Sequence, residues 1–206
     1  MTNCCNDKAC EIEALRSRQS SALKIVLGIN IVMFIVELTA GLMSGSLSLL
    51  ADSLDMLGDA LVYSFSIYVV ARDAPMKAVA ALLKGGIMAT FGVFVLGQAV
   101  YKMIFPHIPV FEAIGAIGLL ALGANSLCLL LLWRHRADDI NMSSVWLCSR
   151  NDIIANISVL FAAGGVWLTR SGWPDILVGV ALAALFLQSS LSVLRGAMIE
   201  LRATHA

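Results

Sequence analysis

Charged residues are scarce in this sequence. Only 14% of its 206 residues are charged and 59% are hydrophobic, whereas soluble domains carry a charge on roughly a quarter of their residues. This balance excludes an ordinary soluble fold and indicates a membrane protein. Lysine plus arginine equals aspartate plus glutamate, at 14 each, so there is no basic excess of the kind that binds nucleic acid.

The cysteines do not suit a disulfide framework, because there are 5 of them and they are unevenly spread. Cys4, Cys5 and Cys10 lie in a short polar head, which also lacks the apolar core of a secretory signal peptide. We therefore expect the first span to act as its own insertion signal. The head is either a capture site for soft metal ions in the reducing cytosol or an exposed, disordered tail.

Six apolar stretches are each long enough to cross a bilayer, which takes roughly 20 residues. Short breaks with charged residues, proline or glycine separate them and leave no room for a soluble domain. We predict an all-α integral membrane protein, a six-transmembrane-helix bundle. Its parts are a cytoplasmic Cys-containing segment at 1–21, the transmembrane domain at 22–199 and a short cytoplasmic tail at 200–206, with spans at about 22–43, 46–71, 77–103, 110–133, 142–168 and 174–196.

Most of the loop lysines and arginines fall on one side of this bundle, and little beyond Lys102 and Arg170 falls on the other. The positive-inside rule then places both termini in the cytoplasm. We expect a multi-pass protein of a bacterial inner membrane. Aromatic residues are expected at the two bilayer interfaces, namely Tyr101, Trp133, Trp167 and Trp173.

Ionisable side chains inside the spans are the main functional signal, because each costs about 2.5–3.5 kcal/mol at the bilayer centre. Asp55 and Asp59 are four residues apart in the second span, and Cys148 and Asp152 repeat that spacing in the fifth. Residues so spaced share one helix face. If the two faces meet, four ligands converge on a tetrahedral site for a divalent metal ion, and the thiolate favours zinc, cadmium or softer ions over magnesium or calcium.

Other polar residues of the spans are assigned supporting roles. Asp52 lies near the face of Asp55 and is expected behind the ligands or in a salt bridge, for example with Lys84. Glu37 and Asn30 share a face of the first span, and Arg150 could pair with an acid. An isolated acid could instead hold helices together, and an isolated cysteine in a span is usually a small apolar residue.

These residues resemble the signatures of the cation diffusion facilitator family. The segment 46–59, preceded by Asn30 and Glu37, is similar to the family's second-span motif S-x-A-L-x-A-D-x-x-H/D-x-x-x-D, and 148–152 is similar to the fifth-span motif H/D-x-x-x-D. The resemblance covers all six spans. It implies that Asp55, Asp59, Cys148 and Asp152 are the metal ligands, and Asn125 in the fourth span matches a further family position.

Two features depart from that family. Its members usually add a cytoplasmic ferredoxin-like domain that binds metal and helps dimerisation, and no such domain follows residue 199, so we expect a short form without that regulation. Cys148 stands where the family usually has histidine or aspartate, which widens the metal range from zinc to cadmium, mercury or lead. A homodimer is expected from the resemblance.

The resemblance implies a transporter rather than an enzyme. Zn²⁺ or Cd²⁺ would leave the cell in exchange for protons by alternating access, with no prosthetic group and with membrane lipid around the bundle. One alternative is a membrane metal sensor or accessory protein that transports nothing. An intramembrane aspartyl protease also needs two facing aspartates, but the flanking motifs do not resemble those enzymes.

Overall fold

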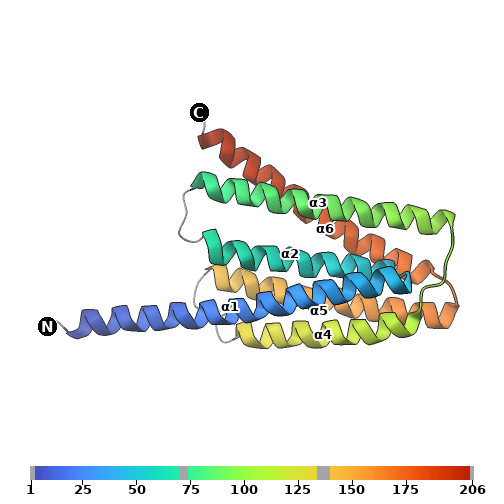
Figure 1. Ribbon diagram of the computed structural model, residues 1–206, viewed down its shortest axis with the longest axis horizontal. Helices are drawn as coiled ribbons and strands as arrows, with labels where there is room; N and C mark the ends of the chain where they lie inside the picture. The colour runs from blue at the N-terminus through green and yellow to red at the C-terminus, as the bar shows by residue number, and fades with distance from the viewer. Residues whose placement is uncertain (1–2, 70–73, 134–139, 205–206) are drawn as a thin grey trace.

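Six long helices run back and forth along one direction in the computed structural model (Figure 1). The structure describes the backbone of residues 3–69, 74–133 and 140–204, and the side chains of residues 21–61, 63–64, 82–83, 85–133, 152–196 and 198–199. The helices are α1 (Asn3–Ser44), α2 (Leu47–Val69), α3 (Ala74–Ile104), α4 (Phe111–Trp133), α5 (Ile140–Thr169) and α6 (Trp173–Thr204).

Each predicted span falls on one of these helices, so the predicted all-helical membrane bundle is confirmed. Two helices run further than their spans: α1 begins at Asn3, and α6 continues to Thr204. A helix satisfies its own backbone hydrogen bonds and needs no apolar sequence to continue into water. The head contains no proline or glycine, the two residues that disfavour a helix most, and residues 3–20 extend α1 rather than forming an irregular tail.

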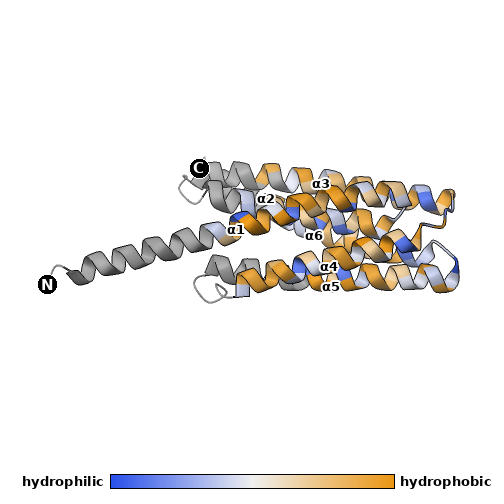
Figure 2. Ribbon diagram, turned by 60° about the horizontal axis from the view of Figure 1, so that its bottom comes forward, coloured by the Kyte–Doolittle hydropathy of each residue, from blue (hydrophilic) through white to orange (hydrophobic). Residues whose placement is uncertain are grey.

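The outside of the bundle is apolar. Five helical segments in the described part of the chain, on every helix except α2, are long and apolar enough to cross a membrane. Figure 2 shows hydrophobic residues over most of their length, and large side chains such as Leu130, Phe161 and Leu168 are at least 66% exposed. A surface of this kind is unstable in water and is suited to lipid.

The helix α2 carries three aspartates in 23 residues. It is the central helix and contacts α1, α3, α5 and α6, and every residue from 46 to 54 is buried. The surrounding helices shield its acids from lipid. This position explains how a helix with so many acids fits in the bundle.

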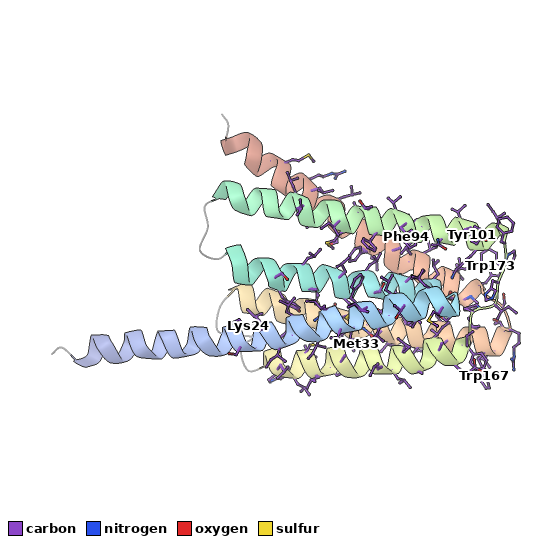
Figure 3. The ribbon with its side chains drawn as sticks, in the orientation of Figure 1. Lys24, Met33, Phe94, Tyr101, Trp167 and Trp173 are labelled. Atoms are coloured by element: carbon purple, nitrogen blue, oxygen red, sulfur yellow. The ribbon has the colours of Figure 1, made fainter. Side chains whose placement is uncertain are left out.

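The two ends of the bundle are distinct. Both chain termini lie at one end, here called the termini end (Figure 1). Tyr101, Trp167 and Trp173 gather at the opposite end, here called the far end (Figure 3), and each is more than half exposed. This placement fits an aromatic belt at a bilayer interface.

The helices α3 and α6 form a close pair beside α2. Two glycines of α3 allow the approach, because a Cβ on Gly85 would lie 2.7 Å from Leu194 Cγ and one on Gly92 would lie 2.6 Å from Leu187 Cγ. Ser190 Oγ also donates a hydrogen bond of 2.8 Å to the carbonyl oxygen of Gly85. Small residues and interhelical hydrogen bonds of this kind hold membrane helices together where no hydrophobic effect is available.

At the far end, Asp175 of α6 caps the first turn of α2. Its carboxylate accepts hydrogen bonds from the backbone N–H groups of Leu47 (2.6 Å) and Ser48 (3.0 Å), and from the hydroxyl groups of Ser46 (2.7 Å) and Ser48 (2.6 Å). Asp175 is 1% exposed. The first N–H groups of a helix have no partner within it, so this carboxylate fixes both the start and the axial position of α2.

The turn before α2 is held from a third helix. Gly45 has a φ of +65°, a left-handed conformation that glycine adopts without strain. The ammonium group of Lys102 on α3 donates a hydrogen bond to the Gly45 carbonyl oxygen. Three helices thus converge on the residues that precede the aspartates of α2.

Replacement of Asp175 by alanine should lower the free energy of unfolding by about 3 kcal/mol, because it leaves buried donors of α2 without an acceptor. Thermal unfolding in detergent micelles measures the effect. The matched control is Glu112→Ala, which removes an exposed carboxylate from the first turn of α4. Equal stability of the two variants would show that the capping carboxylate does not hold α2 in place.

Candidate metal centre

The second and fifth helices bring two of the candidate ligands together. Asp55 on α2 and Asp152 on α5 share a side-chain hydrogen bond, and α2 contacts α5. Asp152 is 7% exposed, and Asp55 is partly buried. Two carboxyl groups can share a hydrogen bond only when one of them carries a proton. A positive charge between the two groups, from a proton or a metal ion, would offset their repulsion.

Asp59 lies one helical turn from Asp55, as the spacing requires. It is 9% exposed, and its Oδ2 accepts a hydrogen bond of 2.9 Å from the hydroxyl group of Tyr63, which is 1% exposed. This bond fixes one oxygen of Asp59 and leaves the carboxylate with further lone pairs. Tyr63 was not predicted as a site residue, although its position four residues after Asp59 was a usable signal.

The polar residues of α1, α2 and α4 share one depth in the bundle. On one side of them, Met33, Met56 and Ala121 pack together. On the other side, Val26, Tyr63 and Cys128 pack together. Between these two apolar clusters, each of the three helices presents one buried polar residue: Asn30, Asp59 and Asn125. The depth is near the middle of the bundle, as the position of Met33 in Figure 3 shows.

Three buried asparagines leave part of their amide groups without a hydrogen bond. The side-chain NH₂ groups of Asn30 and Asn156 donate to the carbonyl oxygens of Val26 (2.9 Å) and Asp152 (2.7 Å). The Oδ1 atoms of both residues have no partner, and neither does Nδ2 of Asn125. Buried polar atoms are rarely left in this way. Asn156 was not predicted, and it lies one turn from Asp152 on α5.

Glu37 and Asp52 form a second acidic group. Their exposed fractions are 0% and 1%, and none of their four carboxylate oxygens has a hydrogen-bond partner. Glu37 is close enough to Asp52 and Asp55 for their charges to act on it. The predicted partner of Asp52, Lys84, has a side chain outside the described residues.

Several predicted site residues lie outside the part of the chain whose side chains are described. Cys148 and Arg150 occupy α5, one turn or less before Asp152, and the cysteines of the head occupy the start of α1. These are Cys4, Cys5 and Cys10. Among the described side chains, no group of three or more His, Cys, Asp or Glu residues is arranged to hold a metal ion.

The arrangement brings carboxylates and other polar atoms together inside an apolar bundle. Asp55, Asp59 and Asp152 supply carboxylate oxygens in the middle of an apolar bundle, and the asparagines around them supply further polar atoms without partners. In such surroundings an ionised carboxylate is stable only beside a positive charge. A proton and a divalent ion can each supply it, but not at the same ligand atom at once.

Comparison with known proteins gives one consistent result. Residues 23–201 match the cation efflux transmembrane domain. The chain is 24% identical over 197 residues to the zinc transporter ZitB of Yersinia pestis. The matched region covers 88% of this chain and 62% of that protein. It is 25% identical over 194 residues to the metal cation efflux system protein CzcD of Cupriavidus metallidurans, which covers 84% of this chain and 61% of that protein.

The chain thus spans about three fifths of the length of these relatives. The matched residues include the second half of α1, all of α2 to α5 and nearly all of α6. The resemblance seen in the second- and fifth-span motifs is confirmed, and this chain belongs to the cation efflux family, the cation diffusion facilitators, through its transmembrane domain.

Proposed function

We propose that this protein exports divalent heavy-metal ions across a bacterial inner membrane in exchange for protons. The observation that carries the proposal is the hydrogen bond between the carboxyl groups of Asp55 and Asp152 in the middle of the bundle. It supports a site that holds a positive charge between α2 and α5. The names of the relatives, a zinc transporter and a metal cation efflux protein, agree with it.

The proposed ligands are Asp55 and Asp59 from α2 and Cys148 and Asp152 from α5. The structure supports this set in two ways: Asp55 contacts Asp152, and Asp59 lies one turn along the same helix. Cys148 is four residues before Asp152 on α5 and so lies on the face of that helix that Asp152 occupies. Four ligands of this kind suit tetrahedral coordination of Zn²⁺ or Cd²⁺.

Protons would be exchanged for the metal because ligands must lose their protons to bind it. Without metal, a proton shared by Asp55 and Asp152 would offset their mutual repulsion. A metal ion arriving from the cytoplasm displaces that proton, and protons arriving from the other side displace the metal after the bundle has changed its opening. The inward proton gradient then drives metal export.

We also propose a homodimer, as expected from the family resemblance, with two candidate surfaces for its interface. Large apolar side chains of α3 and α6 are exposed, such as Val93 at 63% and Leu185 at 64%. Lipid also covers surfaces of this type, so the state is best measured directly by mass photometry of the purified protein in detergent or nanodiscs.

Replacement of Asp59 or Asp152 by alanine should abolish metal export. We expect at least a hundredfold loss of initial rate, which corresponds to about 3 kcal/mol of binding free energy. The protein should still insert. Fluorescence assays of zinc uptake into inside-out proteoliposomes, with and without a pH gradient, measure the rate. Ser158→Ala, which alters an exposed hydroxyl on α5, is the control. Normal export by either aspartate variant would remove the proposed site, and metal binding without flux in the unaltered protein would favour the sensor alternative.

Replacement of Cys148 by histidine should shift selectivity toward zinc, because an imidazole is a harder ligand than a thiolate. We expect the ratio of zinc to cadmium transport to rise about tenfold, which corresponds to about 1.4 kcal/mol. Competition assays with the two ions measure it. The matched control is Cys128→Ala, a buried cysteine on α4 that packs against Tyr63. A change of selectivity in the Cys128 variant alone would show that the thiol ligand lies on α4 and not on α5.

Replacement of Tyr63 by phenylalanine should weaken zinc binding about tenfold, because the hydrogen bond that orients Asp59 is lost while the ring still packs. Isothermal titration of the detergent-solubilised protein with zinc gives the dissociation constant. Tyr101→Phe, at the exposed far end, should leave it unchanged. Equal affinities for all three proteins would mean that Tyr63 serves packing alone.

A further inference from the structure

Glu37 of α1 and Asp52 of α2 lie at a similar depth where these two helices pack together. Two contacts bracket them: Gly41 of α1 lies against Leu50 of α2, and Met33 of α1 packs with Met56 of α2. Glu37 lies between Met33 and Gly41, and Asp52 lies between Leu50 and Met56. Both acids therefore sit closer to the far end than Asp59 does.

No described group neutralises Glu37. It is 0% exposed and neither of its oxygens has a hydrogen-bond partner. The titratable groups that act on it from α2 are Asp52 and Asp55, which are both acids. On α4, which also packs against α1, the described titratable side chains are Glu112, exposed near the far end, and Cys128, which lies toward the termini end beside Tyr63.

A carboxylate in such a place needs a positive charge, and among the groups outside the protein a metal ion or a proton can supply it. A divalent metal ion would need several ligands, and no three acidic, cysteine or histidine side chains in the described part of the chain are arranged to hold one. A proton needs only the carboxylate itself. The neutral carboxylic acid is the form that burial favours.

We propose that Glu37 carries a proton of the exchange cycle at a position separate from the metal ligands. This inference rests on the proposed function. A divalent ion at Asp55 brings positive charge close to Glu37 and stabilises its carboxylate, so the O–H bond breaks and the proton passes to water. When the metal leaves, the carboxylate takes a proton from water again, and the neutral acid returns.

Asp52 links Glu37 electrostatically to the proposed metal site. Its charge lies beside Glu37 and also beside Asp55, so a change of charge at the metal site is transmitted to Glu37 through a nearby acid rather than through a long path. Interactions between charges are strong in the low-dielectric interior of the bundle. Metal occupancy and the proton on Glu37 are therefore mutually exclusive to a measurable degree.

The experiment counts protons released per zinc ion bound. Isothermal titration of the whole purified protein with zinc, in two buffers of different ionisation enthalpy, gives this number for the unaltered protein, for Glu37→Gln and for Glu112→Gln as the exposed-acid control. We expect Glu37→Gln to bind zinc and to release about one proton fewer, because glutamine has no proton to lose. In proteoliposomes it should equilibrate zinc but accumulate less of it under a pH gradient.

Three results would decide against the inference or against its basis. Unchanged proton release by a folded Glu37→Gln variant that binds zinc would overturn it. Release of no protons by the unaltered protein would instead overturn the proposed exchange function. If Glu37→Gln does not fold, Asp52→Asn serves, because removal of the neighbouring charge should move proton release to lower pH, and an unmoved release curve would overturn the inference.

Discussion

The structure depends on one constraint, which is that carboxylates in an apolar bundle need a positive charge beside them. Asp52, Asp55 and Asp59 all lie on α2, and Glu37 and Asp152 reach them from α1 and α5. Lipid offers no water to solvate these groups. The helix α2 lies at the centre of the bundle, where four other helices cover it and shield its acids from lipid. A chain of acids is stable there only while protons or metal ions occupy it.

The far end of the bundle provides the rigid frame for this chain of acids. The carboxylate of Asp175 accepts hydrogen bonds from Ser46, Leu47 and Ser48, whereas the oxygens of Glu37 and Asp52 have no hydrogen-bond partner. The contrast separates two kinds of buried acid in one protein. An acid with four donors holds structure, whereas an acid with none is free to change its charge. The fixed start of α2 sets the depth of every aspartate that follows.

Much of the architecture could be predicted from the sequence because the apolar runs and their breaks are local signals. The face shared by Asp55 and Asp59 follows from helical spacing alone. The hydrogen bond between Asp55 and Asp152 could only be expected from the family motifs, because it joins helices far apart in the chain. Asp175 was missed for the same reason: at a helix start it looks like any acid that favours the helix dipole, and its partners lie more than 125 residues away.

The position of Asp55 links the two acidic groups. It shares a hydrogen bond with Asp152 on one side and acts electrostatically on Asp52 and Glu37 on the other. A single change of occupancy at Asp55 is therefore felt on α1 and α5 together. Because α1 packs mainly on α2, and α5 mainly on α4, such a change bears on two helix pairs at once. The proposed alternating access requires coupling of charge to helix arrangement, and we propose Asp55 as the residue that provides it.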